Sequence, residues 1–167
     1  CVKLIENALD KCISNVDKFL ARDEQAVSYV MEALVLSGVA IGLHGDSRPA
    51  SGAEHNFAHY WDMDAISRNA EHPLHGNSVA VGTVVTAYVY EYMKPYLPDG
   101  LPNTDPQKII GLLKRLGSCY SPKDIGISRE LFIDSMYKAY KLKPRYTIFN
   151  LAEEKGMLDK ITKELTE

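Results

Sequence analysis

Apolar residues recur at helical spacing along almost the whole chain, and this periodicity is what most restricts its fold. The first twenty residues carry one aliphatic stripe, made of Val2, Ile5, Leu9, Cys12, Ile13, Val16 and Leu20. Steps of three and four residues place such side chains on one face of an α-helix, whereas a half-buried strand needs strict alternation. We find no alternation of useful length in the sequence. The pattern therefore predicts an all-α fold.

Capping residues and breakers divide the pattern into about seven or eight helices. Asp23 can cap a second helix, whose segment 33–43 is nearly all apolar and is therefore expected in the core of the bundle. Ser51 and Glu54 match the capping box that opens a helix. Further helix starts are predicted at His75 or Gly76, at Asp105 with Pro106, at Ser128 and on each side of Gly156. We predict one α-helical domain over residues 1–167.

Composition narrows the possible partners. The chain has 167 residues, of which 46% are hydrophobic and 25% charged, as in ordinary globular domains. Its net charge of -3 gives no electrostatic case for nucleic acid or an anionic membrane, and we count no apolar run of the ~20 residues that a membrane span needs. Three scattered cysteines without a C-x-x-C pair indicate free thiols in a reducing compartment, so we expect a cytoplasmic protein. Because the chain opens on Cys1 inside a helical pattern, we expect it to be a piece of a longer protein.

Three histidines mark the candidate site. His55 and His59 stand four residues apart, which places both on one helical face. For that pair alone, surface or hydrogen-bonded core histidines are the more common explanation of the spacing. His75 changes the balance, since Gly76 and an apolar run follow it and place a third imidazole at the mouth of a buried helix. Neutral imidazole is the commonest side-chain ligand of zinc-like ions, so the trio favours a metal or substrate site.

A basic residue precedes the helix that carries His55. Helix N-termini favour anions, and Arg48 beside such a terminus would suit a phosphate or a carboxylate. The alternative is a surface arginine paired with Asp46 or Glu54. A catalytic zinc-like site also needs about three protein ligands. Glu54 is assigned to capping, and the spacing selects no other carboxylate as the third.

These motifs resemble a known superfamily. The run Ser47-Arg48-Pro49-Ala50-Ser51-Gly52-Ala53-Glu54-His55, with His59-Tyr60-Trp61, Leu74-His75-Gly76 and Val81-Gly82-Thr83, is similar to the metal-dependent polyol dehydrogenases. That superfamily includes glycerol dehydrogenases, iron-containing alcohol dehydrogenases and 3-dehydroquinate synthases. Within it, the chain most resembles the glycerol-1-phosphate dehydrogenases, in their bacterial AraM-like branch. The resemblance covers essentially the whole chain.

The resemblance implies that two domains of the enzyme have different roles. This chain would be the dehydroquinate synthase-like C-terminal helical domain, while the N-terminal α/β domain that binds NAD or NADP is absent from it, so no cofactor-binding residue is assigned. By position, His55 and His75 would be ligands of a divalent ion (zinc, nickel or iron), and His59 would be the catalytic, substrate-contacting residue. The family's third ligand, an Asp, would precede Cys1. Arg48 as a phosphate contact is a separate hypothesis.

The implied activity is metal-assisted hydride transfer between dihydroxyacetone phosphate and glycerol 1-phosphate, a small phosphorylated substrate. The full-length protein is expected to form homo-oligomers, and the fragment alone is expected to be inactive. A glycerol dehydrogenase or a 3-dehydroquinate synthase-like enzyme remains an alternative, as does a helical interaction module without catalysis.

Overall fold

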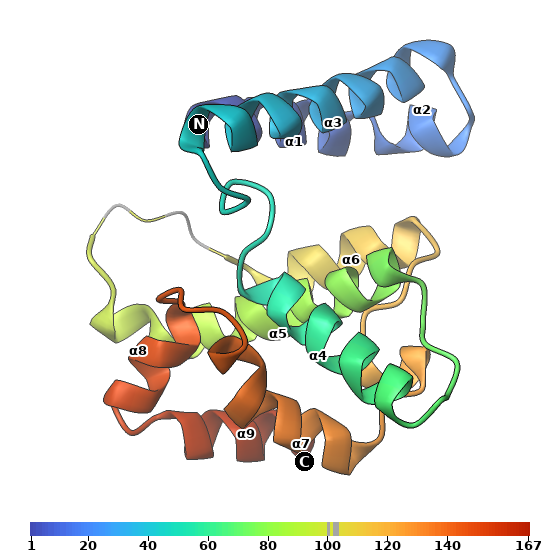
Figure 1. Cartoon of the computed structure of the whole chain (residues 1–167). Coiled ribbons are helices and arrows are strands. Elements are labelled where there is room, and N and C mark those ends of the chain that lie inside the picture. Colours follow the sequence, from blue (N-terminus) through green and yellow to red (C-terminus); the bar gives the residue numbers. More distant parts are fainter. Residues whose placement is uncertain (100, 102–103) are drawn as a thin grey trace. The chain divides into compact units, whose positions relative to one another are not determined.

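Helices make up the regular structure of the chain. The computed structural model describes residues 1–99, 101 and 104–167, and within these it contains nine α-helices and three short 3-10 helices, with no strand (Figure 1). Eight of the α-helices have seven or more residues, so the predicted all-α fold of seven or eight helices is confirmed. Contacts divide the chain into two compact units, Cys1–Gly52 and Ala53–Glu167. We describe each unit by itself, and the single domain over 1–167 stays a prediction.

Unit 1, residues 1–52, is a pair of long helices with a short one at their turn. It contains α1 (Val2–Ser14), α2 (Val16–Leu20) and α3 (Glu24–His44), with α1 packed along α3. The predicted cap is confirmed, because the Asp23 carboxylate accepts a hydrogen bond from the backbone N–H of Ala26 at 3.0 Å. The stripe predicted through Leu20 is interrupted at Asn15, where the backbone leaves helical geometry.

The structure of α3 differs from two expectations, namely that its apolar segment is buried and that no apolar run is long enough to span a membrane. The apolar segment 33–43 was expected in the core, yet only Ala26 and Ala40 of α3 are buried, and Leu43 is 73% exposed. Within unit 1 only α1 and α2 lie along α3, and they cannot cover a helix that is apolar on every side. With 21 residues and a mean hydropathy of 1.8, α3 is also long and apolar enough to cross a membrane by length and composition. One such helix is weak evidence, since core helices of soluble proteins pass the same test.

Unit 2, residues 53–167, is built around two long helices. The central pair is α4 (Ala53–Ser67) and α5 (His75–Met93). Around it lie α6 (Pro106–Arg115), α7 (Arg129–Lys138), α8 (Ile148–Glu154) and α9 (Leu158–Thr166), with 3-10 helices at Lys94–Tyr96, Pro122–Ile125 and Ala139–Lys141. The predicted helix starts are confirmed, since Asp105 caps α6 and Ser128 caps α7 through side-chain oxygens.

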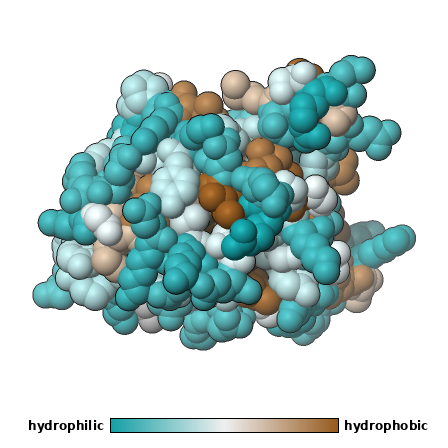
Figure 2. Space-filling view, turned by 90° about the horizontal axis from the view of Figure 1, so that it is seen from below, coloured by the Kyte–Doolittle hydropathy of each residue, from teal (hydrophilic) through white to brown (hydrophobic). Residues whose placement is uncertain are grey.

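Aromatic rings form the centre of unit 2. Phe57 packs against Trp61 and Phe149, with ring centroids 5.5 and 5.1 Å apart, and Tyr140 stacks on Phe149 at 6.0 Å. These side chains are almost fully buried. They come from α4, α8 and the short helix after α7, so they fix the inner face of α4 in place. Seen from below, hydrophilic side chains cover most of the surface and apolar residues show only in small patches (Figure 2).

The two central helices meet backbone to backbone at Gly82. A Cβ atom placed on Gly82 would lie 2.5 Å from the carbonyl oxygen of Glu54, far inside van der Waals contact. Only glycine allows so close an approach. Glu54 directly precedes His55, and Gly82 lies two turns after His75, so the contact holds the two histidine-bearing helices close together.

Candidate metal centre

Unit 2 brings the three predicted histidines together. His55 and His59 lie one turn apart on α4, and His75 is the first residue of α5. The ring centroids of His55 lie 6.3 Å from His59 and 5.7 Å from His75, and those of His59 and His75 are 5.4 Å apart. Three imidazoles at these separations can contact one small ligand or ion. Their individual roles remain predictions.

Each of the two histidines predicted as metal ligands has a carboxylate on its Nδ1 atom. Nδ1 of His55 lies 2.8 Å from Oε1 of Glu54, and Nδ1 of His75 lies 3.0 Å from Oδ2 of Asp62. An ionised carboxylate only accepts hydrogen bonds, so a neutral ring in this contact donates through Nδ1–H and has its lone pair on Nε2. Histidines that bind metals almost always donate their second ring N–H in this way.

His59 has a different electrostatic environment. Burial is the largest cause that lowers the pKa of His59 below its ordinary value, followed by the nearby cation of Lys143 and then by His75 and His55. The neutral imidazole is therefore favoured. A neutral ring can accept a proton or a hydrogen bond from a substrate hydroxyl.

Asp62 is the residue that sequence reasoning missed. One ligand atom each of His59, Asp62 and His75 lies within 4.8 Å of the other two. Among the described residues, these three form the group that could hold a metal ion. Asp62 stands seven residues after His55, which is two helical turns and therefore the same face of α4. Sequence reasoning did not use this spacing, and whether any carboxylate of this chain binds the ion stays a prediction.

The donor set fits a divalent transition metal. Imidazoles with one or two carboxylates suit zinc, nickel or iron. Oδ1 of Asp62 is buried without a hydrogen-bond partner among the described residues, and a buried polar atom of this kind calls for a cation or a donor. The donor types present therefore fit such an ion. The group whose ligand atoms lie within 4.8 Å of one another contains His59 and Asp62 but not His55, so the assignment of His55 and His75 as ligands stays a prediction.

Arg48 lies in unit 1, and its local contacts match the alternative that the sequence analysis left open. Its backbone N–H donates to Oδ1 of Asp46 at 2.7 Å, and its Nε lies 3.7 Å from Oδ2 of the same carboxylate. The side chain is 54% exposed. A role for Arg48 in binding phosphate stays a proposal.

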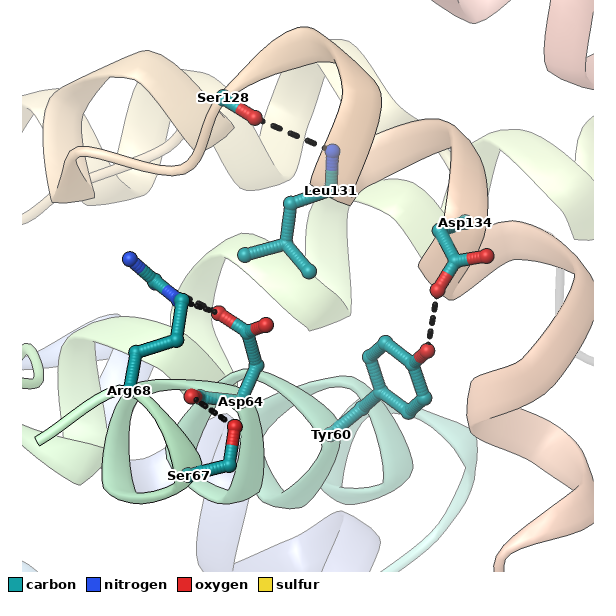
Figure 3. A network of polar contacts seen from close by, with 7 residues as sticks. All are labelled: Tyr60, Asp64, Ser67, Arg68, Ser128, Leu131 and Asp134. Atoms are coloured by element: carbon teal, nitrogen blue, oxygen red, sulfur yellow. Dashed lines mark hydrogen bonds and ion pairs between the residues drawn. The ribbon is translucent and has the colours of Figure 1, made fainter.

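The opposite face of α4 is held by a polar network (Figure 3). The hydroxyl of Tyr60 donates to the carboxylate of Asp134 on α7, and Arg68 pairs with Asp64 through two nitrogens, at 2.9 and 2.6 Å. Burial and the Asp134 hydrogen bond raise the pKa of Tyr60 to about 12. The pair of Arg68 and Asp64 lies within one turn at the end of α4, whereas the bond from Tyr60 to Asp134 joins α4 to α7. This bond and the aromatic core fix the orientation of α4.

The chain is similar to known proteins over most of its length. No protein-family model matches the chain. A curated glycerol-1-phosphate dehydrogenase [NAD(P)+] from Methanocorpusculum labreanum is 37% identical to it over 139 residues, which cover 83% of this chain and 34% of the relative. Proteins of the same name from Methanoregula boonei and Bacillus licheniformis are 31% and 29% identical, over 98% and 93% of this chain. The chain spans 34% to 42% of the length of these relatives, and the resemblance inferred from its motifs is confirmed.

Proposed function

We propose that this chain, a relative of the glycerol-1-phosphate dehydrogenases over most of its length, is the metal- and substrate-binding part of such an enzyme. The observation that carries the proposal is the convergence of His55, His59 and His75, with a carboxylate on Nδ1 of two of them. The reaction proposed for the intact protein is the NAD(P)-dependent interconversion of dihydroxyacetone phosphate and glycerol 1-phosphate.

The three histidines would have different roles. His55 and His75 would hold the divalent ion through Nε2, since their Nδ1 atoms already donate to Glu54 and Asp62. When bound, such an ion supplies Lewis-acid polarisation of a ketone oxygen. His59, whose neutral form is favoured, would orient the substrate hydroxyls or take up and release a proton.

Further groups complete the proposal. NAD or NADP would bind to a part of the intact protein that corresponds to the region of the relatives outside this match. The nicotinamide would supply the hydride. Arg48 is proposed to contact the substrate phosphate, because a guanidinium matches phosphate geometry. We further propose that the intact protein is a cytoplasmic homo-oligomer; its three cysteines are free, as a reducing compartment requires.

An assay of the intact protein tests the proposal. Purified with its bound metal, it should oxidise NADH or NADPH when given dihydroxyacetone phosphate, and the product should be glycerol 1-phosphate. Turnover of glycerol with no activity on the phosphate would favour a glycerol dehydrogenase. Cyclisation of a heptulosonate phosphate would favour a 3-dehydroquinate synthase-like enzyme. Absence of all three activities would support an interaction module instead.

A further inference from the structure

We propose that Asp62 is a positioning residue that fixes the ring of His75 so that Nε2 faces the ion. The inference rests on the proposed metal site, and it deepens that site by adding a residue from within unit 2. Its starting point is the 3.0 Å contact between Oδ2 of Asp62 and Nδ1 of His75.

The two partners differ in how firmly they are held. Asp62 lies inside α4, next to the buried Trp61 and two residues before Asp64, which pairs with Arg68. Its side chain is 20% exposed. His75 is the first residue of α5, and its side chain is 46% exposed. A half-exposed side chain at a helix start has several rotamers open to it, and ordering it costs conformational entropy. The less exposed carboxylate within α4 therefore orients the more exposed imidazole at the start of α5.

The contact also determines the tautomer of His75. Because the carboxylate accepts, the proton of a neutral His75 ring resides on Nδ1, and the lone pair resides on Nε2. This is the tautomer that a metal ligand needs when its Nδ1 faces away from the ion. Glu54 makes the same contact to His55 at 2.8 Å, so the two proposed ligands are prepared alike.

The second oxygen of Asp62 faces the loop before α5. Oδ1 lies 3.8 Å from Nδ1 of His72, too far for a hydrogen bond, while Nδ1 of His72 lies 3.0 Å from the carbonyl oxygen of Pro73. Direct ligation of the ion by this oxygen is the rival role of Asp62. In that role, Asp62 would contribute to Zn²⁺ binding as strongly as a histidine ligand does.

The test uses the intact protein and three variants. Asp62→Ala removes the acceptor, and Asp62→Asn keeps an oxygen acceptor of the same shape without the charge. Asp64→Ala is the matched control, since Asp64 lies on the opposite face of α4 and pairs with Arg68. Two readouts are taken: the imidazole ¹⁵N shifts of His75 in metal-free protein, and the dissociation constant of Zn²⁺.

We expect His75 to be in the Nδ1–H form in the unmodified protein, in Asp62→Asn and in Asp64→Ala, and to lose that preference in Asp62→Ala. The Zn²⁺ dissociation constant should rise about 10- to 100-fold in Asp62→Ala and stay close to the original value in the other two. If Asp62→Asn loses Zn²⁺ as completely as His75→Ala does, Asp62 is a ligand and the proposal is overturned. An unchanged His75 tautomer in Asp62→Ala also overturns it.

Failure of the role of Asp62 can be told apart from failure of the proposed function. The tautomer is measured without metal or substrate, so it reports on Asp62 even if the intact protein has no dehydrogenase activity. Conversely, an active enzyme with an unaltered His75 in Asp62→Ala would leave the proposed function standing and remove only the role of Asp62.

Discussion

The carbonyl oxygen of Glu54 lies against the α-carbon of Gly82, so close that a Cβ atom there would be 2.5 Å from it. This contact joins α4 to α5 beside the histidine cluster. Since the oxygen belongs to the backbone of α4, it cannot move aside as a flexible side chain would. The spacing of the histidines therefore depends on a residue that bears no functional group.

Replacing Gly82 with alanine should push the two helices apart. We expect Gly82→Ala to lower the free energy of unfolding by about 1–3 kcal/mol, the usual cost of overpacking, and to weaken metal retention. Gly76→Ala is the control, because a Cβ on Gly76 meets nothing within 4 Å. Urea denaturation and metal analysis measure the two effects. Equal stability of the two alanine variants would contradict the close approach.

The contact between Tyr60 and Asp134 makes a second prediction. Tyr60→Phe removes a hydrogen bond to a carboxylate on α7 and should lower the free energy of unfolding by about 1 kcal/mol. Tyr146→Phe removes a similar bond to Glu154, but Tyr146 is 63% exposed, so we expect little change. Thermal unfolding of both variants at neutral pH provides the comparison, and a larger loss for Tyr146→Phe would refute it.

The same tyrosine predicts a dependence on alkaline pH. Burial, followed by the bond to Asp134, raises the pKa of Tyr60 to about 12, above the ordinary value of 10.0. The folded state thus favours the neutral phenol, and this contribution is complete below pH 10 and is lost as the pH rises through 12. The free energy of unfolding should fall over that window less steeply in Tyr60→Phe. Identical slopes in the two proteins would show that Tyr60 does not contribute.

Residues 1–167 produced alone should reduce no dihydroxyacetone phosphate with NADH or NADPH. The chain spans about two fifths or less of its relatives' length, and we assign it no nucleotide-binding residue. Its affinity for metal should also be lower than that of the intact protein, because the family's aspartate ligand is expected before Cys1. Rapid nicotinamide-dependent reduction by residues 1–167 alone would refute this prediction.

Helix boundaries were predictable because the signals that set them are local. Asp23, Asp105 and Ser128 each accept a backbone N–H within three residues, which depends on no distant contact. The convergence of His55 and His59 was predictable for the same reason, since both lie on one helix.

Features that depend on two helices were harder to predict. Asp62 shares the α4 face of His55, but its contact with His75, thirteen residues away across a loop, cannot be read from the sequence pattern. The exposure of α3 was misjudged because apolar composition does not say how many neighbours a helix has. Gly82 was noted only as part of a motif, and its packing role becomes visible only when the carbonyl of Glu54 is placed beside it.

Metal analysis of the intact protein tests the central claim most directly. After dialysis against a weak chelator, the unmodified protein should retain close to one divalent ion per chain, while His55→Ala and His75→Ala should retain almost none. His59→Ala should keep the ion and lose mainly turnover. Retention of the ion by His55→Ala and His75→Ala, or equal loss in all three variants, would contradict the assignment of His55 and His75 as ligands and His59 as the substrate-contacting residue.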